Sequence, residues 1–147
     1  TNRPNPQSEL DAKFSVQYCL ARGLVDRRVS IEHFEGDSFR DPAVQDVLRR
    51  VFAAPHPDMK MDTFEHFGAE VRVTLKDGTT LTQKVHRPLG RGPENPLPTD
   101  LLDAKFANFS SRAMSPTRVP PLLPDLRTLA SCPSLPPFSD LLQPTAP

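Results

Sequence analysis

The distribution of proline constrains the fold of this chain more than any other feature. Nine of its 18 prolines lie in the last 32 of 147 residues, from Pro116 to Pro147. A proline ring fixes φ and removes a backbone donor, so prolines interrupt helices and are excluded from central strands. Regular helix and strand patterns fill the preceding part. We therefore expect a folded α+β domain over residues 1–110 and, over residues 111–147, a proline-rich tail with one or two short helices.

Composition and charge exclude several classes of protein. The apolar content of 37% fits one soluble domain with a modest core. Lysine plus arginine equals aspartate plus glutamate at 18 each, so no net field favours nucleic acid or an anionic membrane. No apolar run approaches the ~20 residues of a membrane span, and the first residues lack a signal-peptide pattern. We expect a cytoplasmic protein that binds neither nucleic acid nor membrane.

The first helix is predicted from a capping box. Ser8 and Asp11 have the spacing at which a hydroxyl and a carboxylate satisfy backbone amides at a helix start. The helix should continue to about Arg22, where Gly23 would end it. Its apolar residues, which cover more than half of the circumference, are Phe14, Val16, Tyr18, Leu20, Ala21, Leu24 and Val25. Such a helix needs cover on two sides, either from a central position in the fold or from a partner surface outside this chain.

The next stretch contains two helix signals of different clarity. Ser30 could cap a short helix over residues 31–34, although the sequence there also alternates as a strand would. Asp41 is a typical N-cap, and Pro42 suits the first helical position. The apolar face of this second helix consists of Val44, Val47, Leu48, Val51 and Phe52. Two prolines shortly after it should end the helix.

A β-hairpin is predicted between residues 69 and 85. Apolar and polar residues alternate on both sides of a turn at Asp77-Gly78, and Met59 and Met61 indicate a further half-buried strand. A two-residue loop would set apolar side chains opposite polar ones. A three-residue loop with Gly78 in the left-handed region matches the two faces instead. The register would then be Val73 opposite Leu81, Ala69 opposite Val85 and Glu70 opposite Lys84.

Proline also limits the helices that follow the hairpin. Thr99 should cap a third helix. The face of that helix carries Leu102, Phe106 and Phe109. In the tail, the prolines between Pro120 and Pro124 should confine any helix to one short segment after them. Taken together, the patterns predict a two-layer α+β fold in which the hairpin belongs to an antiparallel sheet and the first two helices pack on one face of it.

No catalytic constellation is visible in the sequence. The histidines lie in separate segments without the spacing of a metal site: His33, His56, His66 and His86. Cys19 lies among apolar residues of the first helix and Cys132 lies in the tail, without a CxxC motif, which is typical of a protein in a reducing compartment. We therefore predict no catalytic residue, no bound metal and no cofactor in this chain.

A polar cluster around the start of the first helix is the best candidate binding site. Asn2, Arg3, Gln7 and Ser8 could bind a carboxylate together with the helix N-terminus and the nearby Lys13. Ordinary loop and cap chemistry accounts for the same residues equally well. As a binding site, the cluster predicts a small carboxylate as its ligand.

The residues from Asn2 to Cys19, NRPNPQSELDAKFSVQYC, resemble the start of the C-terminal domain of the MmgE/PrpD family. The resemblance continues through the helix that begins at Asp41, the turn that ends at Gly78, and two segments, Gly92 to Leu97 and Ala104 to Phe106. It covers roughly residues 2–109 in order. The family contains dehydratases, decarboxylases and epimerases of small carboxylic acids, including 2-methylcitrate dehydratase.

The resemblance implies that this chain is the small lid domain of a lyase that acts on a di- or tricarboxylate. Family members pair a large helical N-terminal domain with this α+β domain, and the active site lies in the cleft between them. The chemistry is proton abstraction beside a carboxylate without a metal. Its main acid-base residues belong to the helical domain and to the stretch just before Thr1, so this chain alone should be inactive.

The expected partners are accordingly that helical domain and a small carboxylate substrate, within a homo-oligomer. The alternative is a free-standing, non-catalytic binding or assembly module derived from the same domain. An upstream helical domain in the same polypeptide would favour the first interpretation. Stable association with an unrelated protein would favour the second.

Overall fold

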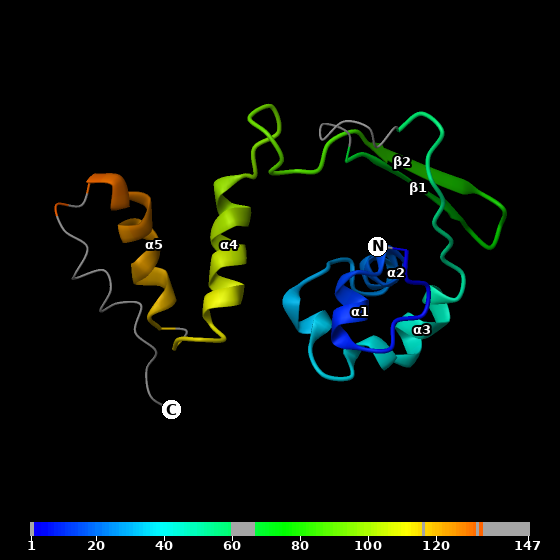
Figure 1. Ribbon diagram of the computed structural model, residues 1–147, viewed down its shortest axis with the longest axis horizontal. Coiled ribbons are helices and arrows are strands. Elements are labelled where there is room, and N and C mark those ends of the chain that lie inside the picture. Colours follow the sequence, from blue (N-terminus) through cyan, green and yellow to red (C-terminus); the bar gives the residue numbers. More distant parts are fainter. Residues whose placement is uncertain (1, 60–66, 116, 132, 134–147) are drawn as a thin grey trace. The chain divides into compact units, whose positions relative to one another are not determined.

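The computed structural model describes residues 2–59, 67–115, 117–131 and 133 (Figure 1). Contacts within the chain divide it into two compact units, residues 1–86 and residues 87–147. Among the described residues, the first unit contains three α-helices, two 3₁₀ helices and a pair of antiparallel strands, and the second contains two α-helices and a 3₁₀ helix. The predicted α+β class is confirmed. No helix within the described ranges is long and apolar enough to cross a membrane.

Two helices, α1 (Glu9–Lys13) and α2 (Val16–Asp26), replace the single predicted first helix. Ser15 separates them because it is the N-cap of α2. Its Oγ accepts a hydrogen bond from the backbone amide of Tyr18 at 3.0 Å and donates one to the carbonyl oxygen of Arg3 at 2.6 Å. The prediction of one continuous helix was therefore wrong, because a serine that fits a helix face is used here to start a new helix.

The predicted start of this helical pair is confirmed, but its predicted end is wrong. The capping role of Ser8 is confirmed, since its Oγ accepts a hydrogen bond from the backbone amide of Asp11 at 3.1 Å. The predicted end at Gly23 is wrong, because Gly23 lies inside α2. The helix ends at Arg27, whose φ of 57° places it in the left-handed region. A left-handed residue ends a helix even when it is not glycine.

Replacing Ser15 with alanine is expected to lower the free energy of unfolding by about 1–2 kcal/mol. Ser15 is only 1% exposed, so the amide of Tyr18 and the carbonyl of Arg3 would lose their partner where water is scarce. Ser8→Ala is the matched control, because it removes an exposed N-cap and should cost about 0.5–1 kcal/mol. Urea unfolding of both variants measures the difference, and equal losses would contradict the role assigned to Ser15.

Two 3₁₀ helices, η1 (Ile31–Phe34) and η2 (Ser38–Arg40), connect α2 to the next helix. The first begins directly after Ser30, which supports the helix and not the strand for this stretch. The backbone amide of Ser30 donates to Nδ1 of His33 at 3.1 Å. The His33 side chain therefore satisfies the backbone amide at the start of η1.

The helix α3 (Pro42–Leu48) is the predicted second helix. Asp41 is its N-cap, as expected, and accepts a hydrogen bond from the backbone amide of Ala43 at 2.9 Å. The helix is shorter than predicted because its last turn tightens, and the amide of Val51 donates to the carbonyl of Leu48 at 3.1 Å. Phe52, assigned to the apolar face, consequently lies beyond the helix and is 89% exposed.

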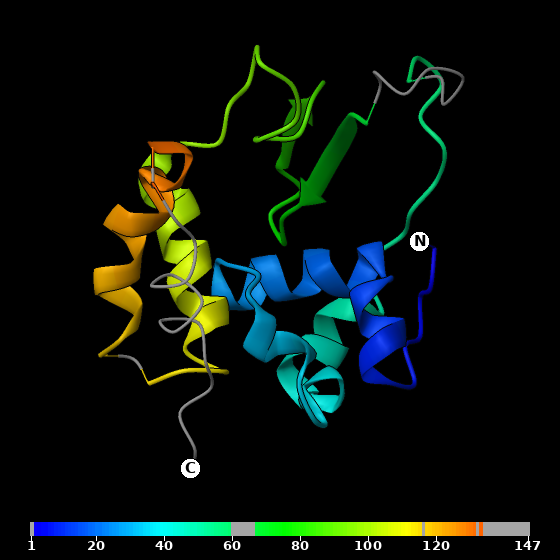
Figure 2. The ribbon, with the colours of Figure 1, turned by 60° about the vertical axis from the view of Figure 1, so that its left-hand side comes forward.

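The core of the first unit forms where α2 packs against α3, the blue and cyan helices of Figure 2. Its buried residues are Ala12, Tyr18, Ala21, Phe39, Val44 and Leu48. The Tyr18 hydroxyl donates to the carbonyl oxygen of His33 at 2.5 Å, and its ring meets that of Phe34 edge-on with 5.8 Å between centroids. Tyr18 therefore joins α2 to η1 through both its polar and its apolar parts.

The hairpin consists of β1 (Ala69–Thr74) and β2 (Thr80–Val85). Its register confirms the prediction in full, with Val73 paired to Leu81, Ala69 to Val85 and Glu70 to Lys84. Gly78 has a φ of +88°, which the three-residue loop requires. Met59 lies in a loop and not in a strand, and Met61 lies outside the described residues.

The hairpin remains open to solvent along β2. Every residue of that strand is exposed, and its apolar residues Leu81 and Val85 are 55% and 43% exposed. In the described part of the chain, helices therefore cover the face of the hairpin less than expected. The reason is that α2 and α3 bury their apolar residues against each other.

The second unit contains α4 (Thr99–Ser110), α5 (Val119–Arg127) and the short η3 (Leu129–Ser131). The third predicted helix is present as α4, although its N-cap is Pro98 and Thr99 is its first helical residue. An ion pair between Asp103 and Arg127 joins α4 to α5. Cys132 lies outside the described residues.

The tail helix α5 contradicts the prediction that prolines would precede any helix there. Pro120 and Pro121 lie in its first turn, where backbone amides have no partner within a helix and proline is tolerated. Pro124 lies inside the helix. Val119 and Leu122 are buried, so packing of the apolar side chains compensates for the missing backbone hydrogen bond.

Candidate functional site

Arg3 and Ser8, two of the predicted binding residues, both contact Asp11. Arg3 forms an ion pair with it. Ser8 accepts from the backbone amide of the same residue as the N-cap of α1. These contacts hold the N-terminal segment against the start of α1, which is the loop and cap chemistry considered above.

Asn2 and Lys13 do not converge with this pair. The Asn2 side chain accepts a hydrogen bond from the amide of Gln17 on α2. Lys13 is exposed in the last turn of α1. Gln7 lines the first of the two pockets described below, and Asn2, Arg3, Ser8 and Lys13 line neither; as carboxylate ligands, all five remain predictions.

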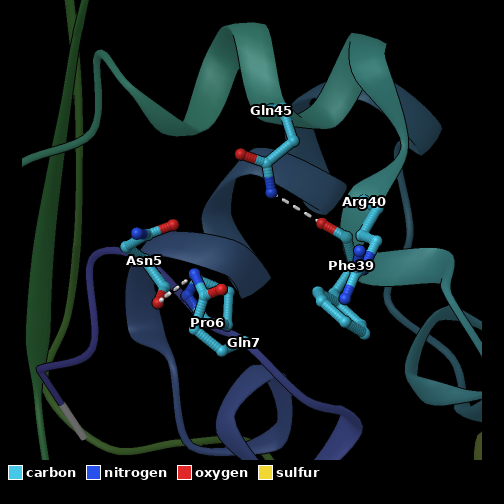
Figure 3. A pocket seen from close by; sticks show the side chains of 6 residues that line it. All are labelled: Asn5, Pro6, Gln7, Phe39, Arg40 and Gln45. Atoms are coloured by element: carbon cyan, nitrogen blue, oxygen red, sulfur yellow. Dashed lines mark hydrogen bonds between the residues drawn. The ribbon is translucent and has the colours of Figure 1, made fainter.

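An open pocket of about 200 Å³ lies beside this N-terminal segment (Figure 3). It is lined by Asn5, Pro6, Gln7, Phe39, Arg40 and Gln45. The first three belong to the N-terminal segment and the others to η2 and α3. The backbone amide of Gly36 donates to the Glu9 carboxylate at 2.7 Å, which ties the loop before η2 to α1. Sequence analysis missed this pocket because its two halves are far apart in the chain.

Hydrogen bonds fix two amide side chains around this pocket. Gln45 donates through Nε2 to the carbonyl oxygen of Phe39 at 2.6 Å, and Gln7 donates to the carbonyl oxygen of Asn5 at 3.3 Å (Figure 3). Phe39 is buried beneath the pocket. The guanidinium carbon of Arg40 lies 5.1 Å from the centroid of its ring. The pocket therefore combines a buried aromatic wall with a polar rim that carries one positive charge.

A second pocket, of about 460 Å³, is lined by Phe52, Pro55, His56, Pro57, Asp58, Glu70 and Arg72. Oε2 of Glu70 lies 3.3 Å from Nε2 of His56, and Oε1 accepts from Nε of Arg72 at 2.5 Å. Nδ1 of His56 accepts from the backbone amide of Asp58 at 3.1 Å, so the ring proton belongs on Nε2. Both ring nitrogens are engaged, which makes His56 a structural link between the loop and β1 and not a free base.

Replacing Glu70 with glutamine is expected to destabilise the protein at neutral pH and progressively less in acid. The hydrogen bond from Arg72, and then that from His56, lowers the pKa of the Glu70 carboxyl in the folded protein. A lowered pKa adds stability above the ordinary value of 4.5, and this stability is lost as the pH falls through the folded-state pKa. Unfolding curves from pH 7 to pH 3 check this. A difference between the two proteins that did not change with pH would contradict it.

The described residues offer little further chemistry. Burial raises the pKa of the Cys19 thiol, so this cysteine is a poor nucleophile. No group of three or more histidine, cysteine, aspartate or glutamate side chains within the described ranges is placed to hold a metal ion. Within that part of the chain, the polar pocket beside the N-terminal segment is the best candidate for binding a small molecule.

Comparison with known proteins places these features in a family. The chain is 32% identical to the cis-aconitate decarboxylase of Mus musculus over 113 residues, which are 77% of this chain and 23% of the mouse protein. It is 31% identical to the cis-aconitate decarboxylase of Homo sapiens over 128 residues, 87% of this chain and 26% of the human protein. The Aspergillus terreus decarboxylase is 28% identical over 116 residues, 78% of this chain and 23% of the fungal protein.

The chain therefore spans about a quarter of the length of these curated relatives. The family model for the MmgE/PrpD C-terminal domain matches residues 1–119, which include the whole first unit, the polar pocket and α4. The match ends where α5 begins. The chain belongs to the MmgE/PrpD family, and residues 1–119 are its C-terminal domain.

Proposed function

We propose that this chain forms the C-terminal part of a lyase that removes a carboxyl group from a small tricarboxylate of the cis-aconitate type. The observation that carries the proposal is the match to cis-aconitate decarboxylases over 77% to 87% of the chain. Sequence reasoning had favoured a 2-methylcitrate dehydratase-like activity within the same family. Decarboxylation becomes the first choice because the relatives described above are all decarboxylases.

The catalytic acid and base of this lyase would come from a second domain. The chain spans about a quarter of the relatives' length, which leaves room for a large preceding region in such enzymes. In the described residues of this chain, both ring nitrogens of His56 are hydrogen-bonded, and burial raises the pKa of the Cys19 thiol. General acid-base catalysis needs a positioned side chain with a suitable pKa. We therefore propose a helical N-terminal domain as the partner.

Exposed apolar side chains on the first unit support such a partner. They lie on and around α1 and α2: Leu10 at 63% exposure, Phe14 at 51%, Leu24 at 52%, Val25 at 38% and Val29 at 46%. The sequence predicted a helix with a second apolar side, to be covered either by a central position in the fold or by a partner surface outside this chain. A cluster of exposed apolar side chains is typical of an interface, because exposing apolar surface to water is unfavourable.

The proposal is tested with the polypeptide extended by the preceding domain. We expect it to release carbon dioxide from cis-aconitate, measured as labelled carbon dioxide from a carboxyl-labelled substrate. 2-Methylcitrate should be the poorer substrate. Dehydration of 2-methylcitrate without decarboxylation of cis-aconitate would overturn the choice of reaction. Absence of both reactions would favour the non-catalytic binding module.

A further inference from the structure

We propose that the polar pocket between the N-terminal segment and η2 binds one carboxylate group of a small di- or tricarboxylic acid, with Arg40 as its anchor. This inference rests on the proposed function for its ligand class and adds a binding site to it. Of the residues chosen from the sequence, Gln7 lines the pocket, whereas Asn2, Arg3, Ser8 and Lys13 do not. The site consists of Asn5, Gln7, Arg40 and Gln45 above the walls formed by Pro6 and Phe39.

The charge of the pocket favours an anion. Arg40 is the one charged residue among the described side chains that line it, and three of the others carry amides. A guanidinium group offers a planar pair of donors that fits a carboxylate, and amide groups can donate to its oxygens. The second pocket differs in this respect, because Asp58 and Glu70 line it together with Arg72. Of these two pockets in the described residues, the first has the net positive lining.

The orientation of Arg40 is fixed on one side. Its Nε lies 3.3 Å from a carboxylate oxygen of Asp37, and its guanidinium lies over the ring of Phe39. Asp37 is 84% exposed and does not line the pocket. Within the described part of the chain, no hydrogen bond or ion pair occupies the two terminal nitrogens of Arg40. A ligand carboxylate can therefore engage those nitrogens without displacing the contacts that hold the side chain.

The size of the pocket suits a small acid. A volume of about 200 Å³ is below the roughly 300–1,000 Å³ of pockets that enclose drug-sized ligands. Pro6 is fully buried and Phe39 is 5% exposed, so these walls offer the carbon skeleton of the acid little surface and binding depends on the polar rim. Because the pocket is open and the Arg40 side chain is 67% exposed, water competes for the same donors. Weak binding, of the order of millimolar, follows.

The test is a titration of the protein with propane-1,2,3-tricarboxylate, an unreactive tricarboxylic acid, followed by ¹⁵N–¹H NMR. The side-chain amides of Asn5, Gln7 and Gln45 report on the pocket directly. We expect their signals to move saturably, and we expect Arg40→Gln to weaken binding about fivefold. Inorganic phosphate at the same concentration should bind more weakly if the site is adapted to a carboxylate.

Arg49→Gln is a closely matched control. Both arginine side chains are 67% exposed, and each pairs at 3.3 Å with an aspartate three residues earlier, Asp37 for Arg40 and Asp46 for Arg49. Arg49 does not line the pocket. Its replacement should leave the affinity within about twofold. Unchanged far-ultraviolet circular dichroism confirms that both variants fold.

Three outcomes would overturn the site: no saturable shift of the pocket amides, equal effects of the two substitutions, or equal binding of phosphate. The experiment is separate from the activity of the extended polypeptide. Decarboxylation without binding at this pocket would remove the site and keep the proposed function. Binding at this pocket without any activity of the extended polypeptide on carboxylic acids would keep the site and remove the proposed function.

Discussion

Purified by itself, this chain is expected to release no carbon dioxide from cis-aconitate above the rate in buffer. A positioned general acid or base contributes about 10²–10⁴ in rate. In the described residues two candidate groups are unsuitable: His56 donates to Glu70 and accepts from a backbone amide, and the half-buried Cys19 thiol has a raised pKa. The polar pocket can bind an acid, but its amide and guanidinium groups act as hydrogen-bond donors and supply no general base.

The measurement is carbon dioxide release at a high concentration of the chain, with the extended polypeptide as the positive control. A rate that is indistinguishable from buffer is the expected result. Turnover by the chain alone, abolished by denaturation and retained through repeated purification, would contradict the account. It would also mean that the acid-base residues lie within these 147 residues.

Replacing Arg22 with methionine is expected to lower the free energy of unfolding by about 2–3 kcal/mol. Arg22 is 5% exposed and lies within the helical core of the first unit. Its donors reach the Tyr18 hydroxyl at 3.0 Å, Asp26 at 3.2 Å, Asp41 at 3.1 Å and the carbonyl oxygen of Ser38. Methionine fills similar space but leaves all four acceptors without this partner.

The size of this effect depends on burial and not on the number of ion pairs. The Asp26 and Asp41 side chains are 29% and 38% exposed, so water can partly replace their lost partner, and the expected loss is below that of a fully buried pair. Arg28→Met is the control, because Arg28 is itself 70% exposed in its pair with the half-buried Glu32, and its loss should cost less than about 0.5 kcal/mol. Thermal and urea unfolding compare the two, and similar losses would contradict the central position given to Arg22.

The parts of the fold that could be predicted from sequence are those fixed by nearby residues. The hairpin register follows from the alternation of Val73 and its neighbours and from the conformational demand of Gly78, all within one turn. The caps at Ser8 and Asp41 bond amides two or three residues away. Local chemistry of this kind is present in the sequence itself.

The parts that could not be predicted depend on distant contacts. Ser15 breaks the first helix because it also bonds the carbonyl of Arg3, a contact that closes only when the N-terminal segment packs against α2. The helix α5 tolerates Pro124 because Val119 and Leu122 become buried. In both cases tertiary packing outweighs a local preference, and the local pattern alone cannot reveal it.

The candidate site follows the same division. The N-terminal segment was identified as important from its polar residues, but Asp11 engages Arg3 and Ser8 within the segment. The pocket uses Asn5 and Gln7 of that segment together with Arg40, and no spacing rule connects the two. A basic residue directly before an N-cap was the one available signal, and by itself it indicates only a helix start.

The most direct test of the central claim is to delete this C-terminal chain from the extended polypeptide and measure carbon dioxide release from cis-aconitate. The account predicts steady turnover by the intact polypeptide and a rate at least about 100-fold lower in the deletion variant. Misplacing the substrate and the catalytic groups is enough to cause a loss of this size. Circular dichroism of the deletion variant shows that the remaining domain is folded. Turnover by that folded variant at the rate of the intact polypeptide would contradict the claim that the C-terminal domain is required for the reaction.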